Sequence, residues 1–275
     1  GPSACQCMLL SGGWRASVLR GADATVIAAS SAEDARELTR AELASWSDEE
    51  FADYAARLPR NYWTGFDTDM HVRHAGLGRT FRDMDVPLLT DFRQVAERKV
   101  TELTLLTVDD AGLFSRVAGS VAGLGINIIG ARITTCTDGT VLDVFQLQTA
   151  DNELVSDKLV LERLQEGITG AVSGTLRPQA ALDERWRSLP ARVRRLPVRS
   201  RVILSNRISS THTVIEINGR DFPGLLHRLT RTLADLGLQI QTATVSTYGE
   251  RAVDVFYVKD LFGLQVHNQA RLDTI

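Results

Sequence analysis

The chain has 275 residues, of which 44% are hydrophobic and 24% charged, and its formal net charge is −3. This composition is ordinary for a globular protein of about one to three domains with a sizeable core. No apolar run approaches the roughly 18 residues that a membrane span needs, and no signal peptide is visible, so we expect a cytoplasmic protein without a membrane partner. The three cysteines, Cys5, Cys7 and Cys136, form neither a disulfide framework nor a set of four zinc ligands.

Residues 1–95 are predicted to form a helical segment, because no convincing strand pattern occurs before about Phe92. Ser47 and Glu50 have the spacing of a capping box, in which each residue satisfies a backbone N–H at the start of a helix. Apolar residues then recur at helical spacing until Pro59, which ends the predicted helix.

Two pairs of polar residues in this segment have alternative interpretations. Asp67 and Asp69 could hold metal ions, but no glycine-serine phosphate loop accompanies them, so capping of the next helix is favoured. His71 and His74 lie three residues apart and could face one metal ion. Nothing nearby completes such a site, so structural histidines are favoured.

Residues 102–147 carry a pattern that recurs at 214–258, displaced by 112 positions. The displacement superposes identical residues at many positions, among them Asp109 with Asp221, Gly112 with Gly224, Arg116 with Arg228, and Ala131 with Ala243. One residue is then lost in a turn, after which Asp143 meets Asp254. Because the register recovers after this slip, we interpret the two stretches as two repeats of one supersecondary unit.

Each repeat is predicted to begin with a short strand, at 103–108 in the first repeat and at 213–217 in the second. An Asp and a Gly follow, and apolar residues then mark one face of a helix that a Leu-Gly step ends. A hairpin comes next, at 126–148 and 238–259. This order is most of a ferredoxin-like βαββαβ unit, so the predicted fold class is α+β with antiparallel sheets.

A second helix is expected from Ser156 in the first repeat, with Leu159, Leu164 and Ile168 on its apolar side. In the second repeat Asn268 could cap a helix, but the chain ends before it is complete. The expected domains are the helical segment at 1–95, the first repeat at 100–175, a linker at 176–212 and an incomplete second repeat at 213–275.

The linker is basic, since eight arginines face only two acidic residues between positions 177 and 201, a local charge of +6. A nucleic-acid-binding face would carry interleaved aromatic side chains, and only Trp186 is present. Nucleic acid is therefore an unlikely partner, and a connector that packs on acidic surface of its own protein is favoured. Residues 198–204 alternate and could form the last strand of the first repeat or pair with 213–217.

The strand-to-helix motifs read Asp-Asp-Ala-Gly-Leu-Phe from Asp109 and Asp-Phe-Pro-Gly-Leu-Leu from Asp221. Leu-Gly-Ile-Asn-Ile from Leu124 and Leu-Gly-Leu-Gln-Ile from Leu236 follow the two helices. Each repeat thus resembles an ACT domain, a module that senses small molecules.

The upstream runs Leu-Pro-Arg-Asn-Tyr-Trp at 58–63 and His-Ala-Gly-Leu at 74–77 extend this resemblance. With the paired repeats and the basic linker, they resemble the C-terminal part of the bacterial PII uridylyltransferase/uridylyl-removing enzymes. The resemblance covers roughly everything after Trp14. It implies that residues 1–95 are the end of an HD phosphohydrolase domain, that PII is a partner through the parent enzyme, and that magnesium or manganese belongs to the parent. Some members of this type transfer AMP instead of UMP.

The metal site of the HD domain in the resembled enzymes contains a His-Asp dipeptide, and no such dipeptide occurs in this chain. We therefore expect no catalytic residue, cofactor or metal site in it. The resemblance implies instead that the two repeats bind an amino-acid effector, L-glutamine. The alternative function is a pair of ACT domains that serves as an interaction scaffold, or that senses another amino acid for an unrelated enzyme.

Two glycine loops carry the candidate effector site: the first loop, Asp109–Gly112, and the second loop, Asp221–Gly224. A glycine in the first turn of a helix lets a ligand approach the backbone, and the helix N-terminus favours a carboxylate. The loop Asp carboxylates and the amide oxygens at the start of the next strand can accept hydrogen bonds from an ammonium group. The candidate residues are Asp109, Asp110, Ala111, Gly112, Leu113, Asn127, Ile128, Asp221, Phe222, Pro223, Gly224, Leu225, Gln239 and Ile240. The plain alternative is that each loop is only a capped, tight connection.

We expect the chain alone to transfer no nucleotide to PII and to remove none, because the resemblance places both catalytic metal sites outside it. Incubation with PII, magnesium or manganese, and UTP or ATP should leave the mass of PII unchanged. A modified PII in this reaction would contradict the expectation.

Overall fold

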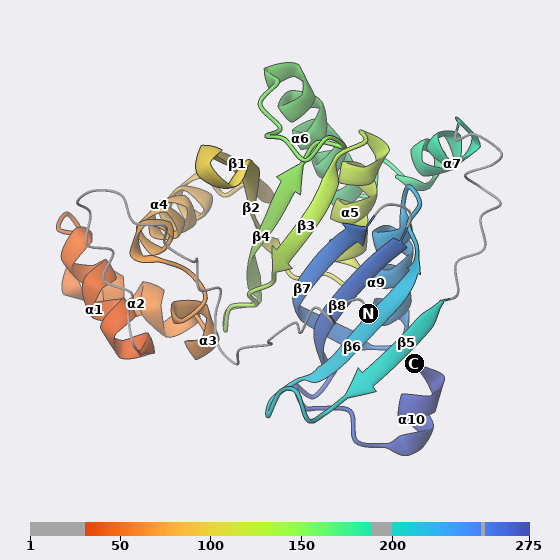
Figure 1. Ribbon diagram of the computed structural model, residues 1–275. Helices are drawn as coiled ribbons and strands as arrows, with labels where there is room; N and C mark the ends of the chain where they lie inside the picture. Colours follow the sequence, from red (N-terminus) through yellow and green to blue (C-terminus); the bar gives the residue numbers. More distant parts are fainter. Residues whose placement is uncertain (1–30, 189–199, 249–250) are drawn as a thin grey trace, which may run out of the picture. The chain divides into compact units, whose positions relative to one another are not determined.

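The structure is a computed structural model that describes residues 31–188, 200–248 and 251–275. Cys5, Cys7 and part of the basic linker lie outside these ranges. The chain divides into two parts, the helical part Gly1–Thr80 and the sheet part Phe81–Ile275 (Figure 1). None of the described helices has both the length and the apolarity that a membrane crossing requires.

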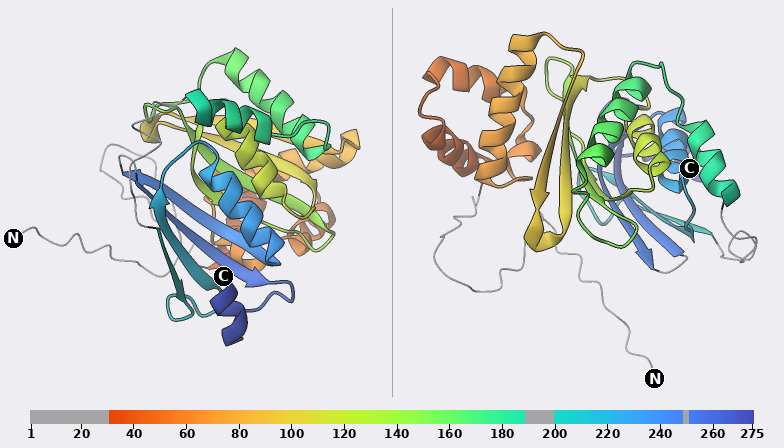
Figure 2. Two further views of the ribbon diagram at one scale, coloured as in Figure 1. Left: turned by 90° about the vertical axis from the view of Figure 1, so that its right-hand side faces the viewer. Right: turned by 90° about the horizontal axis from the view of Figure 1, so that it is seen from above.

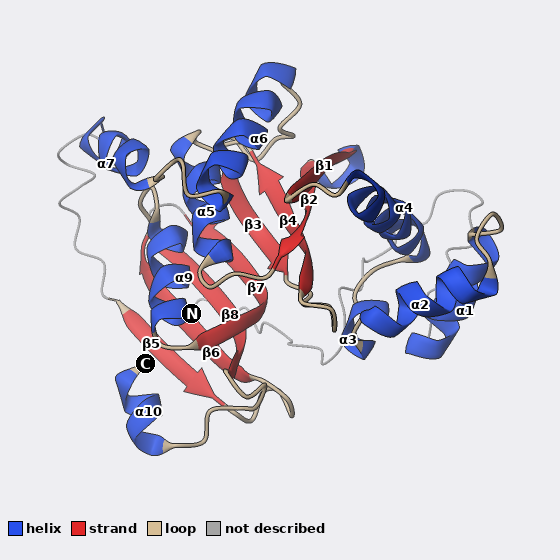
Figure 3. Cartoon of the chain, turned by 180° about the vertical axis from the view of Figure 1, so that it is seen from behind, coloured by secondary structure: helices blue, strands red, loops and turns tan. Residues whose placement is uncertain are grey.

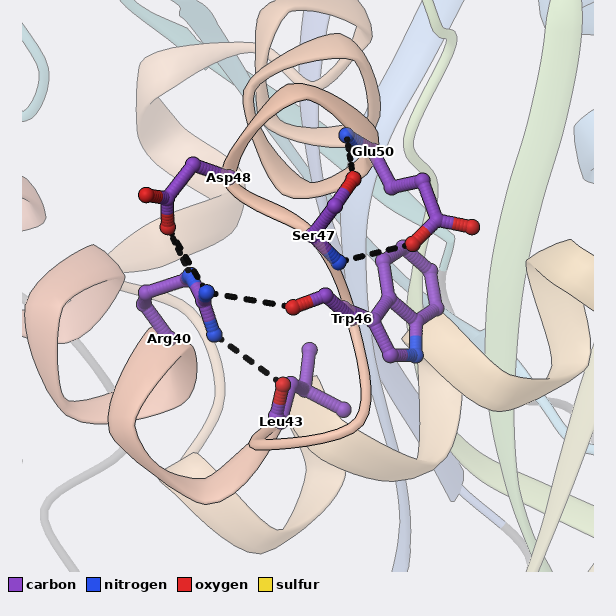
Figure 4. A network of polar contacts seen from close by, with 6 residues as sticks. All are labelled: Arg40, Leu43, Trp46, Ser47, Asp48 and Glu50. Atoms are coloured by element: carbon purple, nitrogen blue, oxygen red, sulfur yellow. Dashed lines mark hydrogen bonds and ion pairs between the residues drawn. The ribbon is translucent and has the colours of Figure 1, made fainter.

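The helical part is held at its helix ends by the polar contacts that the sequence predicted. Its described helices are α1 (Ala32–Glu42), α2 (Asp48–Arg57), α3 (Arg60–Trp63) and α4 (Thr68–Met84), the last of which continues past Thr80. The capping box is confirmed: Ser47 Oγ accepts from Glu50 N at 3.1 Å, and Glu50 Oε2 accepts from Ser47 N at 2.7 Å. Arg40, on α1, donates to the carbonyl groups of Leu43 and Trp46 in the turn that joins α1 to α2 (Figure 4). Both orphan donors and orphan acceptors at this junction are therefore satisfied.

The two polar pairs of the helical part have structural roles. Asp67 Oδ1 accepts from Met70 N at 2.9 Å, which caps α4 as predicted. His71 and His74 are fully buried, and the hydroxyl of Tyr62 lies 3.0 Å from His74 Nδ1. Burial lowers the pKa of His71 to about 4, so this ring is neutral at physiological pH. The packed histidine pair is thus confirmed.

In the sheet part, the described residues form an eight-stranded antiparallel sheet, which agrees with the α+β class (Figure 3). The strands are β1 (Leu88–Val95), β2 (Val100–Val108), β3 (Asn127–Arg132), β4 (Thr140–Gln148), β5 (Arg201–Ser205), β6 (Thr213–Arg220), β7 (Leu238–Tyr248) and β8 (Arg251–Asp260). Their order across the sheet is β1-β2-β4-β3-β7-β8-β6-β5. Each half of this order belongs to one repeat.

Helices α5, α6 and α9 cover one face of this sheet (Figure 2). The helices and the short 3₁₀ turn of the sheet part are η1 (Ala96–Arg98), α5 (Leu113–Gly123), α6 (Lys158–Val172), α7 (Gln179–Ser188), α9 (Leu225–Asp235) and α10 (Gln269–Thr274). On α6, Leu164 and Ile168 are fully buried as expected, but Leu159 is 65% exposed, so its assignment to the apolar face is wrong. Asn268 caps α10 through its contact with Arg271 N, as expected.

The prediction that no strand occurs before about Phe92 is also wrong, because β1 occupies Leu88–Val95 and pairs with β2. The predicted helical segment 1–95 therefore ends too late. Of the two alternatives for residues 198–204, the second is found, since β5 pairs with β6. In both repeats the outer strand precedes the strand-helix motif, so the last strand of each βαββαβ unit comes from the chain before it.

The paired edge strands have the same register in the two repeats. Thr90 pairs with Leu105, and the residues 112 positions later, Val202 and Ile217, pair with each other. A β-bulge follows Ile128 on β3 and recurs after Ile240 on β7. The repeat is therefore real at the level of hydrogen-bond register and not only of sequence.

The two repeats join edge to edge through β3 and β7 and so form an intramolecular pair. Ala131 lies opposite Ala243, its counterpart 112 positions later, while Gly130 faces Thr244 and Arg132 faces Thr242. This pairing has local two-fold symmetry, like a dimer interface within one chain. Each repeat thereby covers a sheet edge that would otherwise be exposed.

The helices above this junction follow the same symmetry. His227 Nδ1 donates to the carbonyl of Ser115 at 2.6 Å, and these residues are again 112 positions apart. Both lie in the first turns of their helices, close behind the two glycine loops. The two repeats are therefore joined through the sheet and through the helix layer.

We predict that Ala243→Glu destabilises the whole sheet part, because Ala243 is fully buried at the junction and no cation lies in register with it. The free energy of unfolding should fall by roughly 3 kcal/mol or more, the scale of an unpaired buried charge. Urea denaturation would measure the loss. The matched control is Ala270→Glu, on an exposed position of α10; an equal loss in both variants would contradict the importance of the junction.

Candidate functional site

The first loop joins β2 to α5 and is open to solvent. Gly112 has φ +78° and stands at the N-cap of α5, just before the first turn in which the sequence had placed it. Arg116 forms an ion pair with Asp110, and its Nη1 donates to the carbonyl of Ala111 at 3.0 Å. Asp109, Asp110 and Ala111 are exposed. The loop is thus held by its own helix while its outer side stays accessible.

The second loop joins β6 to α9 and is less exposed. Gly224 has φ +86° and also stands at the N-cap position. Asp221 accepts a hydrogen bond from Thr247 Oγ1 at 3.4 Å, and the guanidinium of Arg228 lies 5.5 Å from the ring centroid of Phe222. Gly224 is buried, and the other loop residues, Pro223 included, are partly buried. The positive φ explains why both loops have glycine.

The predicted amide partners lie crosswise. Asn127 is the first residue of β3 and pairs with Gln148. The first loop follows Val108, which pairs with Thr140 at the opposite end of the sheet. The expectation that each amide serves the loop of its own repeat is therefore wrong, because a strand runs the length of the sheet between them.

The junction between repeats supplies the missing partners. The ladder of β3 with β7 continues to Ile133, which donates to the carbonyl of Gln241, so the start of β7 with Gln239 lies at the end of the sheet that holds the first loop. By the same symmetry, Asn127 lies at the end that holds the second loop. Each loop thus shares its end of the sheet with an amide of the other repeat.

The apolar members of the candidate set have a different role. Leu113, Ile128 and Ile240 are buried in the hydrophobic core, and Leu225 is partly buried. Their side chains hold the loops and strands in place, so only their backbone groups could meet a ligand. The accessible chemistry is carried by the loop carboxylates, the helix N-termini and the exposed amides of Asn127 and Gln239.

Two buried carboxyl groups beneath the loops were not recognised as site residues. Asp143 on β4 and Asp254 on β8 are each 1% exposed. Burial, reinforced by the carboxylates of Asp109 and Asp221, raises the pKa of Asp143 to about 8 and that of Asp254 to about 7. The available signal was an Asp that recurs between apolar neighbours in both strands, as Val-Leu-Asp-Val-Phe and Ala-Val-Asp-Val-Phe.

The loop carboxyls respond to the same environment. Desolvation raises the pKa of Asp109, whose carboxyl is partly desolvated although the residue as a whole is exposed. Desolvation also raises the pKa of Asp221. Each loop therefore has a pair of mutually repelling carboxyls that a cation would stabilise. A helix N-terminus, which favours an anion, lies beside each pair of carboxyls. The arrangement therefore suits a ligand that carries both a positive and a negative charge.

We predict that the Asp143 carboxyl makes the fold less stable as pH rises. Its folded pKa lies above the unfolded value of about 3.9, so its stabilising contribution is complete below about pH 4 and is lost as pH rises through about 8. Asp143→Asn keeps an oxygen for the Thr134 N–H but cannot ionise. The variant should therefore gain on the order of a few kcal/mol over the wild type between pH 5 and pH 9.

Urea denaturation across this pH range measures the difference, and Asp151→Asn, at an exposed carboxyl, is the matched control. The same pH dependence in wild type and Asp143→Asn would show that Asp143 ionises freely in the folded protein.

Comparison with known proteins agrees with this geometry. The sequence model of the ACR family N-terminal ACT domain matches residues 208–275, which hold the strand-helix-hairpin unit of the second repeat. Bifunctional uridylyltransferase/uridylyl-removing enzymes from Rhodospirillum rubrum, Gluconobacter oxydans and Azospirillum brasilense are 42%, 41% and 43% identical to the chain.

The aligned segments cover 87%, 94% and 86% of this chain but only 26%, 27% and 25% of those enzymes. The chain therefore spans about a quarter of the length of the curated relatives it matches. The resemblance seen in the motifs is confirmed over most of the chain, and the second repeat is an ACT domain. Most of the chain is therefore homologous to one segment of the bifunctional uridylyltransferase/uridylyl-removing enzymes.

Proposed function

We propose that the chain is the amino-acid-sensing regulatory region of an enzyme that attaches nucleotidyl groups to the signalling protein PII and removes them. The observation that carries the proposal is the pair of glycine loops, each at a helix N-terminus and each sharing its end of the sheet with an amide of the other repeat. The relatives are named for both activities, and most of their length lies outside the matched segment. Catalysis, its magnesium or manganese, and work on PII in the cytoplasm belong in this proposal to the parent enzyme.

The proposed effector is L-glutamine. Its carboxylate would meet the N-terminal N–H groups of α5 or α9, where the helix dipole favours an anion. Its ammonium would meet the desolvated loop carboxylate, Asp109 or Asp221, and its amide would exchange hydrogen bonds with Gln239 or Asn127. These three groups need both repeats, so the proposed sensor works only when the β3–β7 junction is intact.

We predict that L-glutamine stabilises the chain by about 2.7 kcal/mol at a hundred times its dissociation constant, through mass action on the folded state. Gly112→Ala should remove the share of this effect that belongs to the first loop. An added Cβ there clashes with no atom, since its nearest neighbour is Ser115 Oγ at 3.6 Å, but it fills the surface that the ligand would approach. Thermal unfolding with and without glutamine measures the effect.

The matched control is Gly174→Ala. Gly174 also has positive φ, at +76°, and open space around its Cα, so it reproduces the backbone strain of about 1 kcal/mol without touching a loop. Gln239→Ala should weaken glutamine binding at the first loop by roughly 0.5–1.5 kcal/mol, the scale of one neutral hydrogen bond. Glutamine stabilisation that survives both Gly112→Ala and Gln239→Ala would exclude the first loop as the effector site.

A further inference from the structure

The helix α7, in the basic linker, covers the second glycine loop. Leu182, on α7, is only 3% exposed although it lies in a connecting segment. A Cβ placed on Gly224 would lie 2.9 Å from Leu182 Cδ1. The room that the missing side chain leaves at Gly224 is therefore already filled by Leu182.

A second contact lies one turn further along α7. The ring of Trp186 meets that of Phe222 edge-on, at 5.5 Å between centroids, and the guanidinium of Arg220 lies 5.9 Å from the centroid of Trp186. These contacts bind α7 to Phe222 within the second loop and to Arg220 just before it. The remaining surface of α7 is exposed and charged, with Asp183, Glu184 and Arg187.

Glycines in α5 and just after it leave room for α7 and for the residue before it. A Cβ on Gly119 would lie 2.6 Å from Pro178 Cβ, and one on Gly123 would lie 3.4 Å from Ala181 Cβ. A Cβ on Gly125 would lie 2.7 Å from the guanidinium nitrogens of Arg185. Any larger residue at the first or the last of these positions would push α7 or its side chains away.

The first loop has no such cover among the described residues. The positions of α9 that correspond to Gly119 and Gly123 are Arg231 and Asp235, an exposed ion pair at 3.9 Å. These charged side chains occupy the surface on which a helix such as α7 would have to pack. Around Gly112, the nearest atoms to an added Cβ belong to Ser115 and Arg116 of its own helix.

We propose that α7 is a detachable cover that closes the second effector loop, so that the chain offers one open loop, at Gly112, while α7 is docked. The proposal rests on the function proposed above for the effector, but the cover itself exists without ligand. Because α7 is held by few apolar side chains and joined to the sheet by a linker, its release is a local event that need not unfold either repeat. Release of α7 opens the second loop and doubles the number of effector sites.

Hydrogen exchange on the ligand-free chain tests the cover directly. The amides of residues 221–226 should exchange at least about tenfold more slowly, relative to their intrinsic rates, than those of 109–114. Leu182→Ala and Trp186→Ala should each abolish most of this difference, because each removes one anchor of α7. Glu184→Ala, on the exposed side of the same helix, is the matched control and should leave it unchanged.

Calorimetry with L-glutamine then counts the open loops. We expect one glutamine per wild-type chain and two per chain for Leu182→Ala. Two sites in the wild type, or slow exchange at 221–226 that both anchor substitutions leave intact, would overturn the cover. If neither protein binds glutamine, the proposed effector fails, and the exchange data alone decide whether α7 closes the loop.

Discussion

The antiparallel pairing of β3 with β7 is the contact on which the rest of the sheet part depends. Each repeat alone would present an unpaired strand edge, and the pairing at Ala131 and Ala243 turns two short sheets into one continuous sheet. Both alanines are buried on the face that the helices cover. The same symmetry places the first turns of α5 and α9 side by side, where His227 bonds to Ser115. Candidate ligand groups from the two repeats share an end of the sheet only because this junction exists.

The backbone of the pair is close to symmetric, whereas the side chains on its surface are not. Glycines at 119 and 123 admit α7 next to the second loop, while Arg231 and Asp235 occupy the equivalent surface next to the first. Few substitutions are needed for this divergence, because a helix–helix contact depends on the size of the residues that face it. Two loops of the same origin can thereby differ in access without any change in the sheet that supports them.

The local elements were predictable because each of them occurs once in each repeat, so that the same sequence pattern is seen twice. Alternation marked β2 and β6, helical spacing marked α5 and α9, and the one-residue slip fell where the β7–β8 turn is shorter. The edge strands were harder to predict, because β1 is only half-buried along its length and its sequence shares little with β5. Their common register is a long-range property that no local pattern shows. The crosswise amides depend on the same long-range pairing, and α7 is too short and too charged to stand out.

The buried carboxyls connect the site to the stability of the fold. Asp143 and Asp254 lie in strands that would pack better with an apolar residue, and burial costs their ionised forms free energy. A cation held between Asp109 and Asp143 would return part of that free energy, because opposite charge favours the ionised carboxyl. The two ionised carboxyls therefore lower the stability of the free protein beside the glycine loops. An element whose stability depends on its ligand is what a sensor requires, since a ligand shifts an equilibrium only by as much as its affinity differs between the two states.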